Sequence, residues 1–321
     1  MSEPTMSQEN TSQRNTTTGV GGLHHVTAIA SRPQGNVDFY AGALGLRLVK
    51  KTVNFDDPGT YHLYYGDEIG RPGTLLTFFP WSMARRGTRG SGETTVVSLA
   101  VADGSLGRWI ERLDRHEVER EAPRNRYGRP AMRLRDPDGM LLELVETAPS
   151  DAEGIVGVAG VAFTLRNLDP TSELLTGTLG MKWTEDGSDR RRFTAGPAGI
   201  FVDLVAAPLT EPGRMGAGTI HHVAWRADDE AHQRDLRGAL VEGGLGVTPV
   251  QDRRYFESIY FREPGGVLFE IATDGPGFLR DESPEELGGK LRLPPWLEGR
   301  RGQIEGLLPE LATSGVEGGT G

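Results

Sequence analysis

Two His-His pairs are the residues of this sequence best suited to chemistry. The stretch GLHHVTAIA covers residues 22–30, and TIHHVAWRA covers residues 219–227. Four of the seven histidines in the 321-residue chain stand in these two similar stretches. Neutral imidazole is the commonest metal ligand among side chains. The repetition therefore predicts a metal held by one histidine from each pair.

The sequence around these pairs is itself repeated. RDPDGMLLELVE (135–146) matches REPGGVLFEIAT (262–273), and each reads as a Pro-Gly turn followed by an alternating strand. The strand carries a glutamate, Glu143 in one copy and Glu270 in the other. The chain thus divides into four related units, each with a strand, a helix and further strands, near residues 22–85, 92–148, 156–207 and 218–274.

A unit of this size cannot cover its own sheet, so units must pair to close a curved sheet. We therefore expect an α+β fold in which four βαβββ units pair into two barrel-like curved sheets, followed by a helical C-terminal tail. The predicted domains are a disordered lead-in at 1–20, a first two-unit domain at 21–150, a second two-unit domain at 151–275 and the tail at 276–321.

Corresponding positions of the four units give the candidate ligands. The opening strands hold, in chain order, His25, Val96, Gly160 and His222. The closing strands hold Thr77, Glu143, Asp203 and Glu270. If the first unit pairs with the fourth, two histidines and one carboxylate share a face with Thr77, which is a poor ligand. Such a 2-His-1-carboxylate triad leaves open positions on the metal and is typical of non-haem Fe(II) oxygenases.

Pairing of neighbouring units is the alternative arrangement. It would bring His222 and Glu270 together with Asp203, and it would leave His25 beside Glu143. Two carboxylates with one histidine match the triad less well. The twin histidine pairs would then serve no common site.

Adjacent histidines cannot both be ligands in a regular strand, because successive side chains point to opposite faces. On this basis His25 shares a face with Leu23, and His24 shares the other face with Val26. The second pair follows the same rule. In each pair we therefore expect one histidine to bind the metal and the adjacent histidine not to bind it directly.

The βαβββ pattern resembles the vicinal oxygen chelate superfamily, which includes glyoxalase I, extradiol dioxygenases and bleomycin-resistance proteins. The resemblance covers roughly residues 22–274. In that superfamily the opening strand of a unit offers a histidine and the closing strand offers a glutamate. The resemblance therefore implies that His25, His222 and Glu270 bind the metal.

A closer resemblance is to the ring-cleaving dioxygenases that open hydroquinones, including chlorinated ones. It is carried by LHHVTAIA, YHLYYGDEIGRPGTLLTFFPW, IHHVAW, DRRYFESIYFREPGG and LPPWLE. It implies Fe(II), which the sequence does not distinguish from Mn(II), with a small aromatic substrate and O2 as partners. It also implies catalytic groups at His24, Thr27, His221, Arg253 and Tyr260. Only one of two para hydroxyls can reach the metal, so the other needs a polar anchor, Arg253 or a histidine.

Three other functions remain open. A glyoxalase-like lyase or isomerase would use the same fold with a redox-inert metal, but it tends to have Glu or Gln where this chain has Thr77. A metal-free, drug-sequestering binding protein would have no use for the triad. A catechol-type extradiol enzyme normally takes its first histidine from the third unit, where this chain has Gly160.

Composition excludes several other classes of function. The net charge of −10 argues against general nucleic-acid binding, which needs a basic face. The lack of cysteine excludes disulfides, thiolate zinc sites and a cysteine nucleophile. No segment has the apolar length of a membrane span. We expect a cytoplasmic protein with no membrane partner, and a homo-oligomer is compatible with the sequence.

Overall fold

Each of the four units contains the expected strand, helix and further strands. The first comprises β1 (Leu23–Ala30), α1 (Pro33–Val37) with a π-helical turn (Asp38–Ala43), β2 (Arg47–Asn54), β3 (Asp57–Gly66) and β4 (Leu75–Pro80). The second comprises β5 (Glu93–Val101), α2 (Leu106–Arg115), β6 (Arg124–Arg126), β7 (Arg129–Arg135) and β8 (Leu141–Glu146). The third comprises β9 (Ile155–Leu165), α3 (Asp169–Gly177), β10 (Lys182–Asp186), β11 (Arg190–Ala195) and β12 (Ile200–Ala206). The fourth comprises β13 (Ile220–Ala227), α4 (Glu230–Glu242), β14 (Gln251–Asp252), β15 (Glu257–Arg262) and β16 (Leu268–Thr273).

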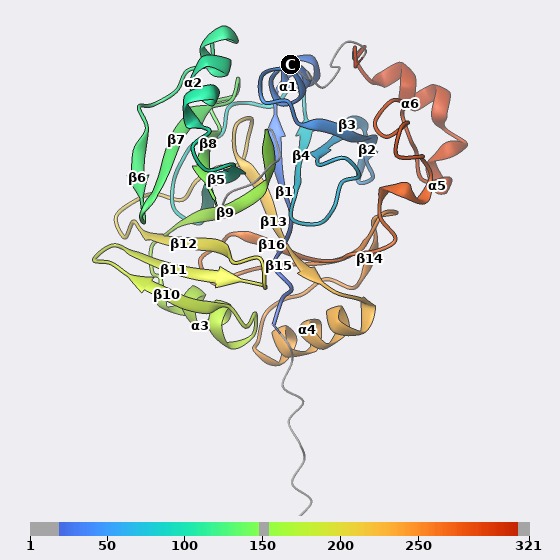
Figure 1. The fold of residues 1–321 in the computed structure, drawn as a ribbon. Coiled ribbons are helices and arrows are strands. Elements are labelled where there is room, and N and C mark those ends of the chain that lie inside the picture. Colours follow the sequence, from blue (N-terminus) through green and yellow to red (C-terminus); the bar gives the residue numbers. More distant parts are fainter. Residues whose placement is uncertain (1–18, 148–153, 314–321) are drawn as a thin grey trace, which may run out of the picture.

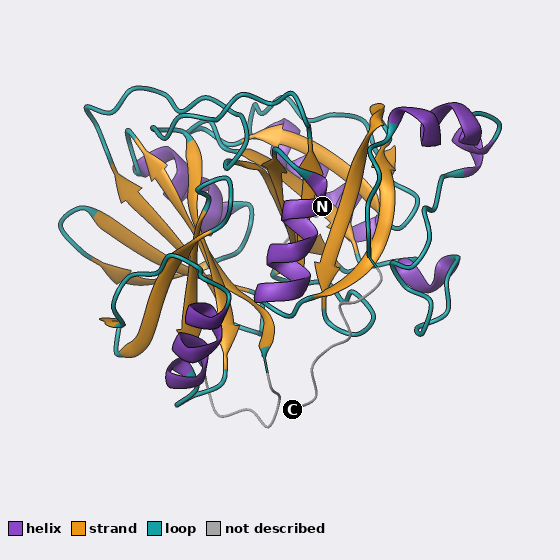
Figure 2. Ribbon diagram, turned by 90° about the horizontal axis from the view of Figure 1, so that it is seen from above, coloured by secondary structure: helices purple, strands orange, loops and turns teal. Residues whose placement is uncertain are grey.

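The strands form two eight-stranded sheets in this computed structural model, which describes residues 19–147 and 154–313 (Figure 1). The first sheet has the order β14-β15-β16-β13-β1-β4-β3-β2, and the second has the order β10-β11-β12-β9-β5-β8-β7-β6. Both sheets are curled and lie side by side (Figure 2). The predicted α+β fold of paired βαβββ units is confirmed.

The first unit pairs with the fourth, and the second pairs with the third. β1 runs antiparallel to β13, and β5 runs antiparallel to β9. The pairing of the first unit with the fourth is therefore as expected, and the neighbouring-unit alternative is wrong. Each sheet takes strands from both halves of the chain. The domain boundaries drawn at 21–150 and 151–275 stay a prediction.

Pro-Gly turns lead into the two glutamate-bearing strands. Gly139 has φ +83° and Gly266 has φ +103°, backbone conformations that a residue without Cβ adopts most readily. The backbone N–H of Gly266 donates to the carbonyl of Glu263 at 2.9 Å, which closes the turn before β16. The strands that follow carry Glu143 and Glu270 into the interior, where both are fully buried.

A β-bulge precedes the opening-strand position in every unit. The pairing of β1 with β13 skips His24 on one strand and His221 on the other, so each is the extra residue of a bulge. In the second sheet the pairing of β5 with β9 skips Thr95 and Ala159, which stand at the corresponding positions. The bulge is thus a feature of all four units.

These bulges overturn the predicted alternation of side chains. Leu23 and Val26 both belong to the main hydrophobic core. The rings of His24 and His25 both pack against Phe256, with centroid distances of 5.0 and 5.3 Å. The extra residue shifts the alternation by one, so both histidines turn to the inside of the curved sheet. The prediction that His25 shares a face with Leu23 is wrong.

Helix α4 supports the strands that carry the candidate ligands. Asp229 caps its N-terminus by accepting a hydrogen bond from a backbone N–H of the first turn at 2.8 Å. Leu236 and Leu240, four residues apart on one face, are buried. Between them and the cap, the Gln233 amide donates to the carbonyls of Glu257 and Ile271 at 2.8 Å each. The helix therefore packs directly on β15 and β16.

The C-terminal segment packs against the first sheet. Its short helices α5 (Pro295–Glu298) and α6 (Arg301–Leu307) lie at the outer edge of that sheet (Figures 1 and 2) and confirm the helical character of the tail. Lys50 of β2 is fully buried and pairs with Asp281 at 2.8 Å and with Glu282. Breaking such a pair would leave an uncompensated buried charge, so it ties the segment to β2.

The chain ends fall largely outside the described residues. The predicted lead-in at 1–20 is described only at Gly19 and Val20, and the backbone N–H of Val20 donates to Leu179 O at 3.0 Å. Residues 314–321 of the tail also lie outside. Within 19–147 and 154–313, no helix combines the length and apolar character needed to cross a membrane.

Candidate functional site

Three side chains converge at the centre of the first sheet: His25 on β1, His222 on β13 and Glu270 on β16. The Nε2 atoms of the two histidines are 3.2 Å apart. Glu270 Oε2 lies 2.9 Å from His222 Nε2 and 3.5 Å from His25 Nε2. All three residues are buried. In the part of the chain that the structure describes, they are the one group of this kind that could hold a metal ion.

The strand register explains the convergence. Ala224 of β13 pairs with Glu270, and Thr27 of β1 pairs with Thr77. His222 lies two residues before Ala224 on β13, and His25 lies two residues before Thr27 on β1. Thr77 thus occupies the position in the first unit that Glu270 occupies in the fourth. Its hydroxyl contacts the Thr27 hydroxyl at 2.7 Å and His62 Nε2 at 2.9 Å, so it is hydrogen-bonded to residues outside the group of three converging side chains.

His24 fixes the proton arrangement of His25. Its Nε2 lies 3.1 Å from the carbonyl oxygen of Thr273, which can only accept, so this nitrogen carries the hydrogen. Burial lowers the pKa of His24 to about 3, and His25 adds to the effect, so His24 is neutral. Its Nδ1 must then accept from Nδ1 of His25 at 2.9 Å. A His25 ring that donates from Nδ1 can offer the lone pair of its Nε2 to a metal.

The second histidine pair repeats this contact. His221 Nδ1 lies 2.8 Å from His222 Nδ1. Burial, with a smaller effect from His222, lowers the pKa of His221 to about 3. Burial likewise lowers the pKa of His222, although Glu270 opposes the shift. Each bulge residue therefore supports its neighbour by a ring-to-ring hydrogen bond, an arrangement typical of metal-binding histidines.

The carboxylate of Glu270 has the hydrogen bonding and the lowered pKa expected of a group that binds a cation. Ser258 donates its hydroxyl to Oε1 at 2.5 Å, while Oε2 is buried and accepts no hydrogen bond. Burial alone would raise the pKa of Glu270, but His25 and His222 hold that pKa well below its ordinary value. A charged carboxylate oxygen and two imidazole nitrogens thus point at one another, an arrangement that a cation bound between them would satisfy.

These side chains open into a cavity of about 420 Å³. Its apolar lining consists of Phe55, Phe79, Phe256 and Leu268. Its polar lining, apart from the three converging residues, consists of Asn54, Asp56, His62, Tyr64, His221, Thr248, Gln251, Arg253 and Tyr260. Flat aromatic walls with several polar groups suit a small, oxygen-bearing aromatic molecule.

Arg253 and Tyr260 act as a pair on one wall of the cavity. Arg253 Nε donates to the Tyr260 oxygen at 3.1 Å, and another guanidinium nitrogen donates to Asp56 at 3.0 Å. Burial and Glu270 raise the pKa of Tyr260 above its ordinary value, so the phenol keeps its proton. Its ring lies 5.8 Å from that of His222. Since its oxygen accepts from Arg253, the phenol hydrogen can be donated toward the cavity.

The structure brings three of the five predicted catalytic groups to this cavity and sets the other two back from it. His221, Arg253 and Tyr260 line the cavity, and His24 supports it from behind through His25. Thr27 is fully buried and contacts Thr77 instead.

His62 and Tyr64 were not predicted from the sequence. The Tyr64 hydroxyl is hydrogen-bonded to His62 Nδ1 at 2.8 Å. A repeat alignment extended to the third strand of each unit could have found them. Tyr64 pairs across the strand with Thr77 as Tyr260 pairs with Glu270, and the residue two positions earlier is His62 in one unit and Ser258 in the other.

The second sheet holds an arginine at the corresponding place. The guanidinium of Arg126 contacts both Glu143 and Asp203, the closing-strand residues of the second and third units. The opening-strand position of the third unit could not carry a side chain without movement, since a Cβ on Gly160 would lie 2.3 Å from Phe201 Cδ2. This sheet therefore places a protein cation between its two carboxylates.

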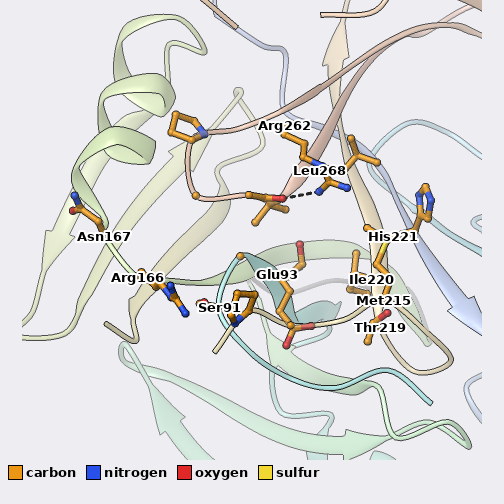
Figure 3. Close-up of a pocket in the computed structure, with 18 of the residues that line it drawn as sticks. Ser91, Glu93, Arg166, Asn167, Met215, Thr219, Ile220, His221, Arg262 and Leu268 are labelled. Carbon is orange, nitrogen blue, oxygen red and sulfur yellow. Dashed lines mark hydrogen bonds between the residues drawn. The ribbon is translucent and has the colours of Figure 1, made fainter. Parts of the chain in front are cut away.

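A separate hollow of about 500 Å³ adjoins β13 at Ile220 and His221 (Figure 3). Glu93, Arg166 and Arg262 contribute charged side chains to its lining. None of the three converging residues lines it, so the candidate metal site belongs to the smaller cavity.

Comparison with known proteins agrees with this geometry. The family model described as the Glyoxalase/Bleomycin resistance protein/Dioxygenase superfamily matches residues 22–144 and 157–271. The chain is 47% identical over 301 residues to "Putative ring-cleaving dioxygenase MhqO" of Bacillus subtilis (strain 168), covering 90% of this chain and 96% of that protein. It is 36% identical over 313 residues to the chlorohydroquinone/hydroquinone 1,2-dioxygenase of Sphingobium indicum, covering 89% and 95%.

Solved structures extend the likeness to three dimensions. The crystal structure of a "putative dioxygenase" from Bacillus subtilis subsp. subtilis str. 168 superposes with a TM-score of 0.88 at 44% identity, covering 92% of this chain and 98% of that one. Glyoxalase I from Zea mays superposes with a TM-score of 0.63 at 14% identity, covering 79% and 92%, a likeness of fold alone. Since the family model spans both sheets and the bacterial relatives align over nine-tenths of the chain, this protein belongs to the Glyoxalase/Bleomycin resistance protein/Dioxygenase superfamily.

Proposed function

We propose that the protein is an Fe(II)-dependent ring-cleaving dioxygenase that acts on hydroquinone-type aromatics, including halogenated ones, with O2. One observation carries the proposal: His25, His222 and Glu270 form a two-histidine, one-carboxylate cluster, and the fourth position holds Thr77, whose hydroxyl is hydrogen-bonded to Thr27 and His62. A metal bound by three protein ligands keeps open positions for substrate and dioxygen. The names of the relatives, which include a hydroquinone dioxygenase, support the same reaction class.

The donor set fits a divalent transition metal. Two imidazole nitrogens and a carboxylate oxygen are ligands that iron and manganese share, and we choose Fe(II) because the proposed reaction activates O2. When bound, the ion would supply Lewis acidity and one-electron chemistry at its open positions. His24 and His221 would hold the ligand rings in the orientation and tautomer that binding requires.

The remaining polar side chains would position the substrate and handle protons. Tyr260 keeps its phenol hydrogen and stands beside His222, so it can donate to an oxygen of the ring that is bound near the metal. In a hydroquinone the second hydroxyl lies para to the first and cannot reach the same metal. Arg253 offers that hydroxyl a positive charge, held in place by Asp56 and Tyr260. His62 and Tyr64 add further polar groups on another part of the lining.

The cavity walls would orient the ring and limit water. Phe79 and Phe256 present aromatic faces, and Leu268 adds an aliphatic surface. An aromatic ring between such walls has little freedom to tumble. The reacting carbon is therefore kept near the metal while polar groups fix the two hydroxyls.

The test is oxygen uptake by protein purified without air and loaded with Fe(II). We expect about one iron per chain, as one triad predicts, and faster oxygen consumption with hydroquinone and chlorohydroquinone than with catechol. Equal or faster turnover of catechol would reject the substrate assignment. Stoichiometric zinc or nickel together with glyoxalase activity would reject the dioxygenase itself. Glu270→Gln is the matched control, since it preserves the shape of the site and removes the charged ligand.

A further inference from the structure

A second, smaller hollow reaches the candidate metal site from behind. Its volume is about 190 Å³, and it lies between the β3–β4 connection and the segment that follows β16. Its lining is largely apolar and includes Ile69, Pro72, Leu75, Phe278 and Leu279. Leu279 is 47% exposed, whereas Leu75 is 1% exposed. The hollow therefore leads from the surface into the interior of the first sheet.

Phe256 is the partition between this hollow and the catalytic cavity. Of all the residues described along the two linings, Phe256 alone belongs to both. Its ring lies 5.0 Å from the His24 ring, on the side of the small hollow, and 5.3 Å from the ring of His25. A rotation of one aromatic side chain would thus connect the small hollow with the metal site.

The lining of the hollow offers few polar groups to a ligand, and the guanidinium of Arg71 among them is largely exposed to solvent. Every titratable side chain on it already has a partner: Arg71 binds Asp67, Asp274 binds Arg226, Tyr255 binds Asp281, and His24 binds His25 and the carbonyl of Thr273. A hydroxylated aromatic that moved inward past Arg71 would lose hydrogen bonds to water and meet titratable side chains that already have partners. A small apolar molecule loses nothing of this kind, and apolar cavities of proteins accept such molecules, xenon among them.

We propose that this hollow admits dioxygen to the metal site, with Phe256 as the gate between the two spaces. The inference rests on the proposed dioxygenase function. An aromatic substrate that fills the 420 Å³ cavity blocks the approach to the metal from that side. The small hollow gives O2 a separate approach through Phe256, where it passes beside His24 and His25. Substrate and dioxygen then reach the metal from different directions.

Two substitutions on the lining test the route, and a third is the control. Leu279→Trp fills the mouth of the hollow, and Ile69→Trp fills its middle. Val241→Trp on α4 is the matched control, because Val241 is also 47% exposed and lies outside both linings. We expect KM for O2 to rise several-fold in the two lining variants. KM for the hydroquinone and the iron content should stay at the wild-type values, and the control should match the wild type throughout.

A measurement independent of turnover completes the test. Crystals pressurised with xenon should show the gas in the small hollow of the wild type and not in Leu279→Trp. An unchanged KM for O2 in both lining variants, or no xenon in the wild-type hollow, would overturn the route while leaving the dioxygenase intact. If the iron-loaded wild type consumes no oxygen with any aromatic substrate, the proposed function fails, and the route fails with it.

Discussion

Arg126 and Arg253 occupy the same position of the repeat, at equal distances before the closing-strand glutamates of their units, and they bind different partners. Arg126 lies in the interior of the second sheet and contacts Glu143. Arg253 is turned to Tyr260 and to Asp56 at the cavity rim. One sheet thus neutralises its glutamate with a guanidinium. The other keeps the equivalent arginine on the cavity wall, and its glutamate belongs to the candidate metal site.

Replacing Arg126 with alanine should destabilise the protein. Glu143 and Asp203 would remain buried and keep Arg124 and Arg192 but lose the cation between them. The loss should therefore stay below about 3–5 kcal/mol, which is typical when a buried charge is left with no partner. Urea unfolding measures the free energy change. Arg253→Ala is the control and should change it far less, because its partner Asp56 is exposed. Equal losses of stability in the two variants would contradict this view of the second sheet.

Tyr260→Phe and Arg253→Ala should both lower turnover while iron content stays at the wild-type level. Neither side chain belongs to the converging group, and both line the cavity where substrate would bind. Loss of the phenol should mainly lower kcat, whereas loss of the guanidinium should also raise KM for the hydroquinone. Steady-state kinetics with metal analysis separates these effects. Unchanged kinetics in both variants would remove the two residues from the mechanism.

His25→Ala should abolish metal binding, and Asp203→Asn should not. His25 contributes one of the three converging ligand atoms, whereas Asp203 lies in the second sheet and contacts Arg126 and Arg192. Iron content after anaerobic loading and desalting is the measurement. Iron retained at full occupancy in His25→Ala would refute the proposed ligand set.

His24→Phe should weaken metal binding without removing it. The substitution keeps the ring against Phe256 but deletes the nitrogen that accepts from His25, so the ligand ring loses its fixed tautomer. Loss of such a supporting partner commonly lowers metal affinity by about 10- to 100-fold. Competition with a chelator measures the affinity. His62→Gln is the control, because His62 contacts Thr77 rather than a candidate ligand. This variant should keep the wild-type metal affinity, and a similar loss of affinity in it would argue against a specific effect of His24.

Asp136 should make stability depend on pH in the acid range. Burial raises its pKa from 3.8 to about 6, although Tyr40 and the backbone N–H of Met140 donate to it. A folded-state pKa above the unfolded value means that the stabilising contribution is present below pH 3.8 and is lost as pH rises through about 6. Between these limits wild type should lose up to about 3 kcal/mol relative to Asp136→Asn. Urea unfolding of both metal-free proteins across this range tests it, and a pH-independent difference would contradict it.

Repeated sequence predicted the larger features of this molecule. The four units followed from matching strand positions, because strand register carries equivalent residues to equivalent places. The pairing of the first unit with the fourth was favoured over the neighbouring pairing because it brings His25, His222 and Glu270 together, as the family resemblance implies. The orientation of His24 did not follow. A bulge adds one residue to one strand of a pair, and nothing in the pattern of apolar residues marks where the added residue stands.

Cavities were also beyond the reach of the sequence. Phe256 separates two spaces only because β1, β15 and the segment after β16 meet around it, and no local pattern records such a meeting. His62 had no obvious partner in the sequence, since its contact with Thr77 depends on the side-by-side placement of β3 and β4. Residues that act through neighbours from other strands need the assembled fold to be recognised.

The bulges at His24, Thr95, Ala159 and His221 bear on the history of this chain. All four units share the bulge, whereas only two carry histidine beside it. The simplest ancestry places the bulge in one ancestral unit before it was duplicated, with histidines gained or lost afterwards by ordinary substitution. A descendant could then acquire or abandon a metal by changing a few side chains, because the backbone that presents them was already inherited.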